Sequence, residues 1–382
     1  MTKALFLLYE GLPENVIDSQ VLTHCKLMKN IGIDFEIWSF ACFTSIYEQS
    51  KQRLDIARKI SDCEVKLFRG IRPAYPFSEF INFLYLSFLL KKSKYGFSFI
   101  HARTDYAADV AVKLKTIPVI YDCRGDSIAE FLDGHQNSNL FLKAYRVWKY
   151  GKNIANAKKY SQKAIFVSSF LKNKIQYNQQ SAIIGCFADS ELFYYDEALR
   201  ISTRKELGLD EVDKILIYSG GMNSYQCFSE CINFFKRLYE KDKQWHFVVL
   251  TTQIDIAKKM ISNSQNIILK KVAFQEVNKY LNAADVGIIL REKHDLNRAA
   301  SPTKFAEYSL AGLSIIYSKE IGDLLEYSSK IGGGYEVEGF TQIPSLRKIH
   351  ILENRQERFN KAKKLLSKNL TLERYQKIYA NL

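Results

Sequence analysis

Short runs of β-branched and aromatic residues alternate with longer segments of helical periodicity along two parts of the chain, and this alternation constrains the fold most. In the first part, the predicted strands are residues 3–8, 33–39, 64–68, 97–101, 117–121 and 164–168. In the second part, they are residues 214–219, 246–251, 266–270, 285–290 and 313–317. Strands that alternate with helices form parallel sheets covered on both faces. We therefore predict an α/β protein with two Rossmann-like, doubly wound domains that face a cleft.

The alternation lapses between residues 187 and 202, where a polar and aromatic stretch shows no period. A chain of 382 residues also exceeds the size at which one hydrophobic core stops growing. We place an amino-terminal domain at 1–190, a second domain at 191–355 and charged helices at 356–382. In doubly wound sheets, ligands bind outside the carboxyl ends of the strands, so each domain is expected to present one wall of the cleft.

The formal net charge of +14 indicates an anionic partner without identifying it. None of the usual nucleic-acid recognition motifs occurs, so we expect no nucleic-acid partner. Two stretches, 80–94 and 145–159, combine aromatic and basic residues. Helices of this kind can rest on an anionic membrane surface, or they can simply have one buried and one solvated face, and both interpretations stay open.

The 7 cysteines are scattered and include no Cys-x-x-Cys pair, which is typical of a reducing compartment. The amino terminus leads directly into a predicted strand, without the features of a signal peptide. No apolar run approaches the ~20 residues that cross a bilayer. We expect a cytoplasmic protein, with peripheral contact at the inner face of the plasma membrane left as an option.

The segment from Ser301 to Gly312 has well-marked helix boundaries. Ser301 suits the N-cap, Pro302 suits the first helical position, and Gly312 ends the helix before the next predicted strand. The amino end of such a helix carries free N–H groups and the positive end of the helix dipole, beside the Ser301 and Thr303 hydroxyls and the Lys304 ammonium. These groups together suit a diphosphate.

Three further residues extend this candidate site. Glu307, one turn into the helix, could accept hydrogen bonds from vicinal ribose hydroxyls, and Arg291 and Arg298 could add positive charge at the phosphates. The alternative is structural: Ser-Pro is a common way to begin a helix, and Glu307 could be a solvated residue.

The run Ser301-Pro302-x-Lys304-x-x-Glu307-Tyr308-x-x-Ala311-Gly312-Leu313 resembles the donor-binding segment of glycosyltransferase family 4, whose members have the GT-B fold. Glu307 matches the second glutamate of that family's E-x7-E motif, which contacts the ribose of the donor nucleotide. Ala299 stands where the first glutamate is expected, so the motif is half present. Members with the Ser-Pro-x-Lys variant commonly lack that first glutamate.

The resemblance extends to both halves of the chain. Gly220 and Gly221 resemble the glycine-rich loop that approaches the donor phosphates, although Gly221 and Gln226 stand at about the places of two basic residues there. Lys304, Arg298 or Arg291 would then supply the charge. The resemblance also implies that the carboxy-terminal helices pack back on the amino-terminal domain.

In the first domain, the resemblance identifies a loop and two strand ends at the cleft. The loop contains Gly11 and Asn15 on the acceptor side, and the strand ends carry His101, Arg103 and Arg124 as candidate catalytic residues. The family implies transfer of a sugar from a nucleoside-diphosphate sugar, with retention at the anomeric carbon. A basic and aromatic first domain suggests a glycan acceptor that is lipid-linked, as in the assembly of bacterial surface polysaccharides such as O-antigen or capsule.

Several alternatives remain at this stage. No Asp-x-Asp dyad appears at a strand end, so we expect no metal, and no cofactor is expected besides the nucleotide sugar as co-substrate. The missing glutamate at 299 favours a non-catalytic nucleotide-binding scaffold as one rival, and a nucleotide-sugar epimerase of the GT-B type is another. A dinucleotide oxidoreductase is disfavoured because neither first strand is followed by Gly-x-Gly-x-x-Gly.

Overall fold

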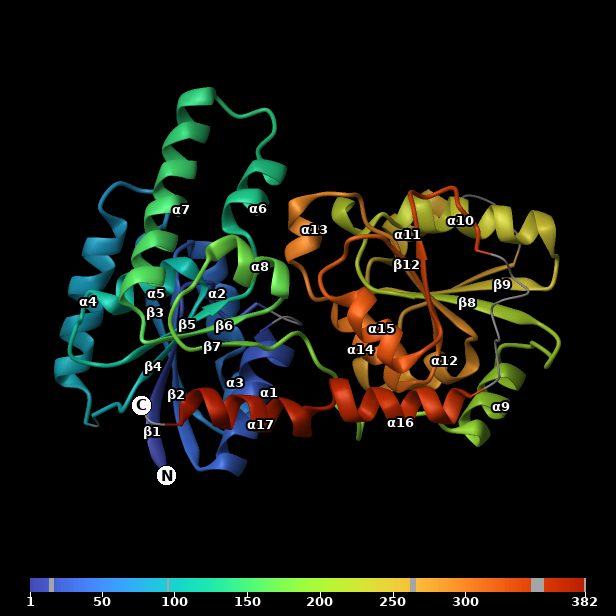
Figure 1. The fold of residues 1–382 in the computed structure, drawn as a ribbon, viewed down its shortest axis with the longest axis horizontal. Coiled ribbons are helices and arrows are strands. Elements are labelled where there is room, and N and C mark those ends of the chain that lie inside the picture. The colour runs from blue at the N-terminus through green and yellow to red at the C-terminus, as the bar shows by residue number, and fades with distance from the viewer. Residues whose placement is uncertain (14–16, 95, 262–265, 345–353, 381–382) are drawn as a thin grey trace. The chain divides into compact units, whose positions relative to one another are not determined.

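The computed structural model describes residues 1–13, 17–94, 96–261, 266–344 and 354–380 (Figure 1). The chain divides into two compact units. The first contains residues 1–185 and 372–382, and the second contains residues 186–371.

The first unit is built on a parallel sheet of seven strands in the order β3-β2-β1-β4-β5-β6-β7. The strands are β1 (Thr2–Leu8), β2 (Ile33–Ala41), β3 (Glu64–Arg69), β4 (Ile100–Arg103), β5 (Val119–Cys123), β6 (Lys163–Phe166) and β7 (Ser181–Ile183). Its α-helices are α1 (Thr23–Met28), α2 (Thr44–Gln52), α3 (Leu54–Ser61), α4 (Ser78–Lys92), α5 (Thr104–Val112), α6 (Ser127–Gly134), α7 (Leu140–Tyr160), α8 (Ser169–Ile175) and most of α17 (Lys368–Tyr379). The strand order reverses between β1 and β4, which is the topological switch point of the sheet.

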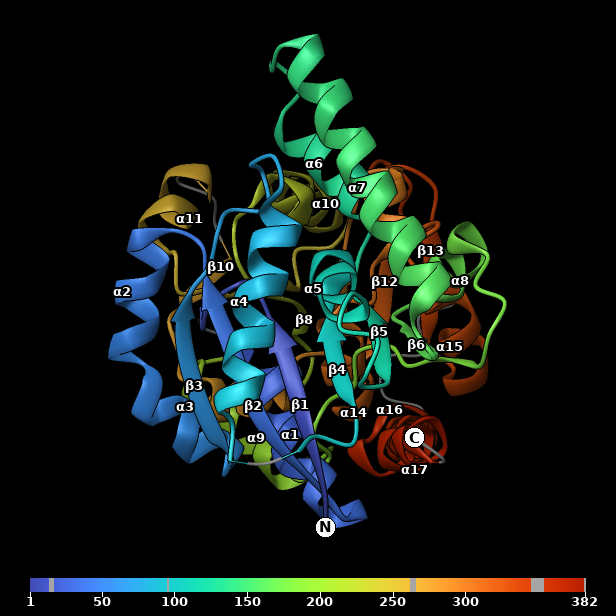
Figure 2. The same cartoon turned by 90° about the vertical axis from the view of Figure 1, so that its left-hand side faces the viewer.

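Both faces of this sheet are covered. On one face, the His101 side chain packs against His24 of α1 and Tyr379 of α17. On the other face, Tyr121 of β5 donates a hydrogen bond to Asp105 of α5. Helices α4 and α7 lie on the side of α5, and Figure 2 shows them in front of the sheet.

The second unit repeats the architecture with six parallel strands in the order β10-β9-β8-β11-β12-β13. The strands are β8 (Lys214–Ser219), β9 (Trp245–Leu250), β10 (Ile267–Lys270), β11 (Val286–Ile289), β12 (Ser314–Ser318) and β13 (Gly334–Val337). The α-helices are α9 (Glu197–Glu206), α10 (Phe228–Lys241), α11 (Ile254–Ile261), α12 (Val277–Ala283), α13 (Asp295–Ala299), α14 (Thr303–Leu310), α15 (Leu324–Ile331) and α16 (Arg355–Leu366). The switch point of this sheet lies between β8 and β11.

Alternate residues along β8 belong to two separate hydrophobic cores of the second unit. Ile215 and Ile217 join a core with Phe305 and Tyr308 of α14, whereas Tyr218 joins a core with Phe228 of α10. Helix α14 therefore packs on one face of the sheet and α10 on the other. This packing holds the amino end of α14 at the carboxyl edge of β8.

The predicted fold class is confirmed, and the predicted strands need two kinds of correction. Strands β4 and β5 lie two or three residues further along than the predicted runs 97–101 and 117–121, because Phe97 and Phe99 are buried without belonging to the sheet. Strands β7 and β13 were not predicted. Both are short edge strands: β7 has three residues, all partly buried, and β13 has four, of which only Val337 is buried, so they lack the continuous apolar run that marks a central strand.

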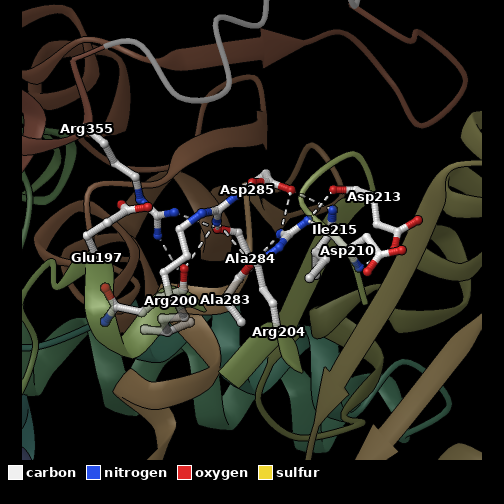
Figure 3. A network of polar contacts seen from close by, with 12 residues as sticks. Glu197, Arg200, Arg204, Asp210, Asp213, Ile215, Ala283, Ala284, Asp285 and Arg355 are labelled. Atoms are coloured by element: carbon white, nitrogen blue, oxygen red, sulfur yellow. Dashed lines mark hydrogen bonds and ion pairs between the residues drawn. The ribbon is translucent and has the colours of Figure 1, made fainter. Parts of the chain in front are cut away.

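A buried ionic network joins α9 to the start of β11 (Figure 3). Oδ1 of Asp285 accepts a hydrogen bond from Arg200 at 2.6 Å. Oδ2 accepts from the backbone N–H of Ile215 at 2.8 Å and from Arg204 at 3.5 Å. Arg355 donates to the backbone oxygens of Leu281, Ala284 and Ala311, where helices α12 and α14 end. Each of these buried cations therefore has acceptors for its protons.

The described helices include none that combines the length and the apolar character needed to cross a bilayer.

Candidate donor site and acceptor side

Helix α14 starts later than predicted, and its cap differs. The helix begins at Thr303, and Pro302 precedes it in an extended conformation. Ser301 makes no cap because its hydroxyl accepts a hydrogen bond from the backbone N–H of Cys186 at 2.9 Å. The helix ends at Leu310, and Gly312 follows it with a φ of 70°, a left-handed conformation, so the predicted end of the helix before the next strand is confirmed. At the amino end of α14, the N–H of Phe305 donates to the backbone oxygen of Pro302, and the N–H groups of Thr303 and Lys304 precede this first bond of the helix.

Lys304 extends from the first turn of α14 toward the loop after β8. Its Nζ donates to Oε1 of Gln226 at 2.6 Å and lies 4.0 Å from the centre of the Tyr218 ring. A Cβ atom at Gly220 would lie 2.6 Å from this Nζ, so the ammonium needs a glycine there. Burial, together with repulsion from Arg291, lowers the pKa of Lys304 to about 7.

Arg291, two residues past the end of β11, reaches the same loop. It is buried, donates to the backbone oxygen of Tyr225, and lies 3.4 Å from Oε1 of Gln226. Its guanidinium also stacks on the Tyr225 ring at 4.9 Å. Burial lowers the pKa of Arg291 from its ordinary value.

Lys304 and Arg291 thus share Gln226 as a neutral acceptor, and each cation lies over a different aromatic ring. Among the described residues, no carboxylate lies within ion-pair distance of either cation. Burying cations without a counter-ion is costly, and the arginines beside Asp285 show how the same unit pairs its cations elsewhere. The two cations flank the switch point between β8 and β11, where sheets of this class bind their ligands. This is a site with a surplus of positive charge.

Glu307 lies one turn beyond Lys304 on α14 and is partly exposed. Burial raises the pKa of Glu307 to about 7, although Lys304 opposes the shift. The carboxyl group therefore lies beside the cations without forming an ion pair with them. Its predicted role as the ribose ligand stays a prediction.

The other residues predicted for the donor site are less closely joined to this pair. Gly221 lies in the same loop, and its backbone oxygen accepts a hydrogen bond from the Tyr218 hydroxyl. Thr303 is partly exposed in the first turn of α14. Arg298 lies 3.4 Å from Asp295 and 3.4 Å from Glu320, so its charge is already opposed by two carboxylates. Ala299 is buried.

Three residues that organise the site were not predicted as parts of it: Tyr218, Tyr225 and Gln226. Gln226 was noted only because it stands where a basic residue was expected, although it accepts hydrogen bonds from both cations. The sequence feature that could have identified Gln226 was its position six residues past Gly220. In the structure it lies in the short 3-10 helix η3 (Ser224–Gln226).

In the first unit, His101 lies in a closed polar network. Its ring is 1% exposed and stacks on Phe6 at 4.4 Å. Nδ1 lies 2.8 Å from the Tyr379 hydroxyl, and Nε2 lies 3.1 Å from Oδ2 of Asp122. The same tyrosine hydroxyl lies 3.1 Å from Nε2 of His24. The catalytic role expected of His101 stays a prediction, and its enclosure favours an action through Asp122.

Asp122 connects His101 to Arg124, whose Nη1 lies 3.6 Å from Oδ1 of the carboxylate. Burial alone would raise the pKa of Asp122, but Arg124, His101 and Arg103 hold it well below its ordinary value. Arg103 itself pairs with Glu10, with 3.0 Å between Nε and Oε2. The structure therefore brings His101 and Arg124 together through a carboxylate and gives Arg103 a different partner.

The predicted acceptor loop is described only in part. Gly11 has a φ of 74°, and a Cβ atom there would lie 2.4 Å from Ile46, so this position requires glycine. Asn15 lies outside the described residues.

Comparisons with known proteins support the fold. No family model matches the chain, and no curated protein matches its sequence. Among solved structures, Anabaena Alr3699/HepE in complex with UDP and glucose is similar over 100% of both chains, with a TM-score of 0.67 and 13% identity. WaaG, a glycosyltransferase involved in lipopolysaccharide biosynthesis, is similar over 94% of this chain and 93% of its own, with a TM-score of 0.59 and 12% identity.

A third solved structure is similar to this chain but carries the name of a different activity. A putative UDP-N-acetylglucosamine 2-epimerase from Listeria monocytogenes is similar over 99% of this chain and 91% of its own, with a TM-score of 0.53 and 10% identity. At these identities, the similarities show a fold. The chain has the two-sheet architecture of the GT-B glycosyltransferase structures.

Proposed function

We propose that this protein is a glycosyltransferase that moves a sugar from a nucleoside-diphosphate sugar to a glycan acceptor. The observation that carries the proposal is the buried pair of Lys304 and Arg291 at the amino end of α14, which has no carboxylate partner within the described part of the chain. A diphosphate supplies the missing negative charge and accepts hydrogen bonds from the free N–H groups of the helix. The GT-B fold is the second support.

In the proposed reaction, the bond between the anomeric carbon and the β-phosphate oxygen breaks, an acceptor hydroxyl oxygen forms the new bond to that carbon, and the hydroxyl proton passes to the departing phosphate oxygen. Negative charge develops on the departing diphosphate, where the Lys304 ammonium, the Arg291 guanidinium and the α14 N–H groups stabilise it. Glu307 holds the ribose by accepting hydrogen bonds from its hydroxyls. The sugar is transferred with retention of the anomeric configuration.

The acceptor is proposed to meet residues of the first unit, around Gly11, Arg103 and Arg124, with His101 supporting them through Asp122. We propose a lipid-linked glycan of bacterial surface-polysaccharide assembly as its class. The similarity to WaaG, a glycosyltransferase involved in lipopolysaccharide biosynthesis, supports this class.

A thermal-shift series tests the donor site. The purified protein is heated with UDP, GDP, ADP, CMP or NAD, alongside Glu307→Ala and Lys304→Met. A ligand at about 100 times its dissociation constant stabilises the folded protein by about 2.7 kcal/mol. UDP is the first candidate, because HepE was solved with UDP. We expect one nucleoside diphosphate to stabilise the wild type and to lose most of this effect in both variants.

The outcome separates the rival functions. Stabilisation by NAD alone, or by none of these ligands, contradicts the proposal. If a nucleoside diphosphate binds, incubation with the matching nucleotide sugar distinguishes the rest: a transferase releases the nucleotide when an acceptor is present, an epimerase changes the sugar, and a scaffold leaves the donor intact. The epimerase stays the second candidate because the putative epimerase from Listeria has a similar fold.

A further inference from the structure

Helix α4 presents its apolar side chains to solvent. The residues that it buries are Ser78, Asn82 and Leu86, whereas its outward residues include Phe80, Ile81, Leu84 and Phe88, all at least 45% exposed. Phe77, directly before the helix, is 77% exposed. These five positions follow the helical spacing of three and four residues, so they form one stripe.

The polar side chains of α4 explain this orientation. The Asn82 amide donates to the backbone oxygen of Ile71 at 2.9 Å and to the Tyr106 hydroxyl at 2.7 Å, and its own oxygen accepts from the Ile71 N–H at 3.0 Å. Ser78 accepts a hydrogen bond from Lys149 of α7 at 3.0 Å. Because these bonds fix the inward face, the apolar stripe stays outward.

Helix α7 continues this surface with positive charge. Lys149 joins α7 to the start of α4 through Ser78 and through Glu79 at 3.2 Å. The 21-residue helix carries six lysines or arginines and no acidic residue. Its outward residues include Phe141 and Trp148, which are 87% and 59% exposed. Lys152 lies over Trp148 at 5.5 Å, as Lys92 lies over Phe88 at 4.3 Å.

Both helices lie on the same side of the sheet in the first unit, and Figure 2 shows them side by side in front of it. We name the outward residues of α4 and α7 together the apolar–basic surface. Exposed apolar residues in a contiguous group mark a surface that binds a partner. Aromatic rings with lysines around them suit the boundary between lipid headgroups and acyl chains, where the rings enter and the ammonium groups meet lipid phosphates.

We infer that the apolar–basic surface docks this protein on a bilayer that contains anionic lipids. The positive charge of α7 favours a lipid surface over a protein partner or a second copy of the chain. Two copies of this basic helix would repel each other, whereas an anionic membrane presents phosphate groups to it. The inference goes beyond the proposed sugar transfer and does not depend on it. A docked enzyme would meet lipid-linked acceptors at the membrane surface.

Co-sedimentation of the full chain with vesicles tests this inference. We expect binding to vesicles of phosphatidylcholine with 30% phosphatidylglycerol, and much weaker binding to phosphatidylcholine alone or in high salt. Leu84→Ser with Phe88→Ser should weaken binding by at least about tenfold, because both side chains lose apolar contact with lipid. Lys152→Gln, Lys158→Gln and Lys159→Gln together should weaken it on the order of 100-fold, at about fivefold for each lysine.

The matched control is Ile256→Ser with Leu325→Ser, two exposed apolar residues of the second unit that are 47% and 59% exposed. This pair should leave vesicle binding unchanged. Thermal unfolding and nucleotide binding verify that every variant is folded, and gel filtration measures the oligomeric state. The inference is overturned if the wild type does not bind the anionic vesicles, if the control weakens binding as much as the α4 pair, or if the α4 pair dissolves a dimer without affecting vesicle binding.

Discussion

The affinity for a nucleotide sugar should fall as pH rises above 7, because the Lys304 ammonium must carry its proton to bind the diphosphate. Burial holds the pKa of Lys304 at about 7 in the free protein, and a bound dianion would raise it. Binding above pH 7 therefore takes up a proton. At pH 8.5, only ~3% of Lys304 keeps its proton, so the affinity should be ~30-fold lower than at pH 6, equal to about 2 kcal/mol.

Glu307 titrates in the same range, since its pKa is raised to about 7, and its ionisation strengthens its bonds to ribose hydroxyls as the pH rises. The two effects oppose each other in the wild type. The measurement is therefore made on Glu307→Gln, which keeps an acceptor oxygen and removes the titration of Glu307. Because the charge of Glu307 raises the pKa of Lys304, the affinity of this variant should fall at least as steeply between pH 6 and 8.5. Titration calorimetry with the nucleotide sugar selected by the thermal-shift series gives the affinity, and buffers of different ionisation enthalpy give the protons taken up.

Glu307→Gln combined with Lys304→Met is the control, and its affinity should be low and independent of pH. If the affinity of Glu307→Gln does not change across this pH range while the protein stays folded, Lys304 does not bind the diphosphate in the way proposed. An affinity that rises with pH would contradict the reasoning in the same way.

Three further predictions concern the geometry of both units. Gly220→Ala should weaken nucleotide binding by more than about tenfold, because its Cβ would displace the Lys304 ammonium. Calorimetry checks this. Gly208→Ala, at another glycine with a positive φ but with no atom within 4 Å of the added Cβ, should bind normally. Asp285→Ala should lower the free energy of unfolding by about 3–5 kcal/mol, because two buried arginines lose their carboxylate; urea unfolding measures this loss, and an unchanged midpoint would contradict it. Tyr379→Phe should lower the stability by about 1–3 kcal/mol, because its hydroxyl serves two buried imidazoles; the same assay applies, and the exposed Tyr160→Phe should be neutral.

The central strands of both sheets could be predicted from the sequence because each is a run of apolar residues buried on both faces. Strands β7 and β13 could not, because β7 has only three residues and Gly334 and Glu336 interrupt the apolar residues of β13, whereas the edge strands β3 and β10 carry enough apolar residues to be predicted. The alternation that predicts the fold class depends on the central strands and on the edge strands β3 and β10, which were also predicted. The predicted fold class was therefore correct despite errors of two or three residues at the ends of β4 and β5.

The candidate site shows a different limit. Gly220, Arg291 and Lys304 could be placed together from the sequence, because the rule for parallel sheets brings the ends of β8 and β11 to one edge beside α14. The cap at Ser301 was wrong because a hydrogen bond from Cys186, distant in sequence, takes the hydroxyl that the local pattern assigns to the helix. A local sequence pattern cannot predict a hydrogen bond to a residue that is distant in the sequence.

Gln226 explains how the site can hold two buried cations without basic residues in the glycine-rich loop. A lysine at this position would bring a third positive charge beside Nζ of Lys304, and a glutamate would neutralise the pair and occupy the place of an anionic ligand. The neutral amide oxygen accepts hydrogen bonds from both Lys304 and Arg291, so it orders the two side chains without neutralising their positive charge. The positive charge that the resemblance implies in the loop after β8 lies instead at the end of β11 and the start of α14, which border the same switch point. The absence of basic residues at Gly221 and Gln226 is therefore compatible with the proposed diphosphate site.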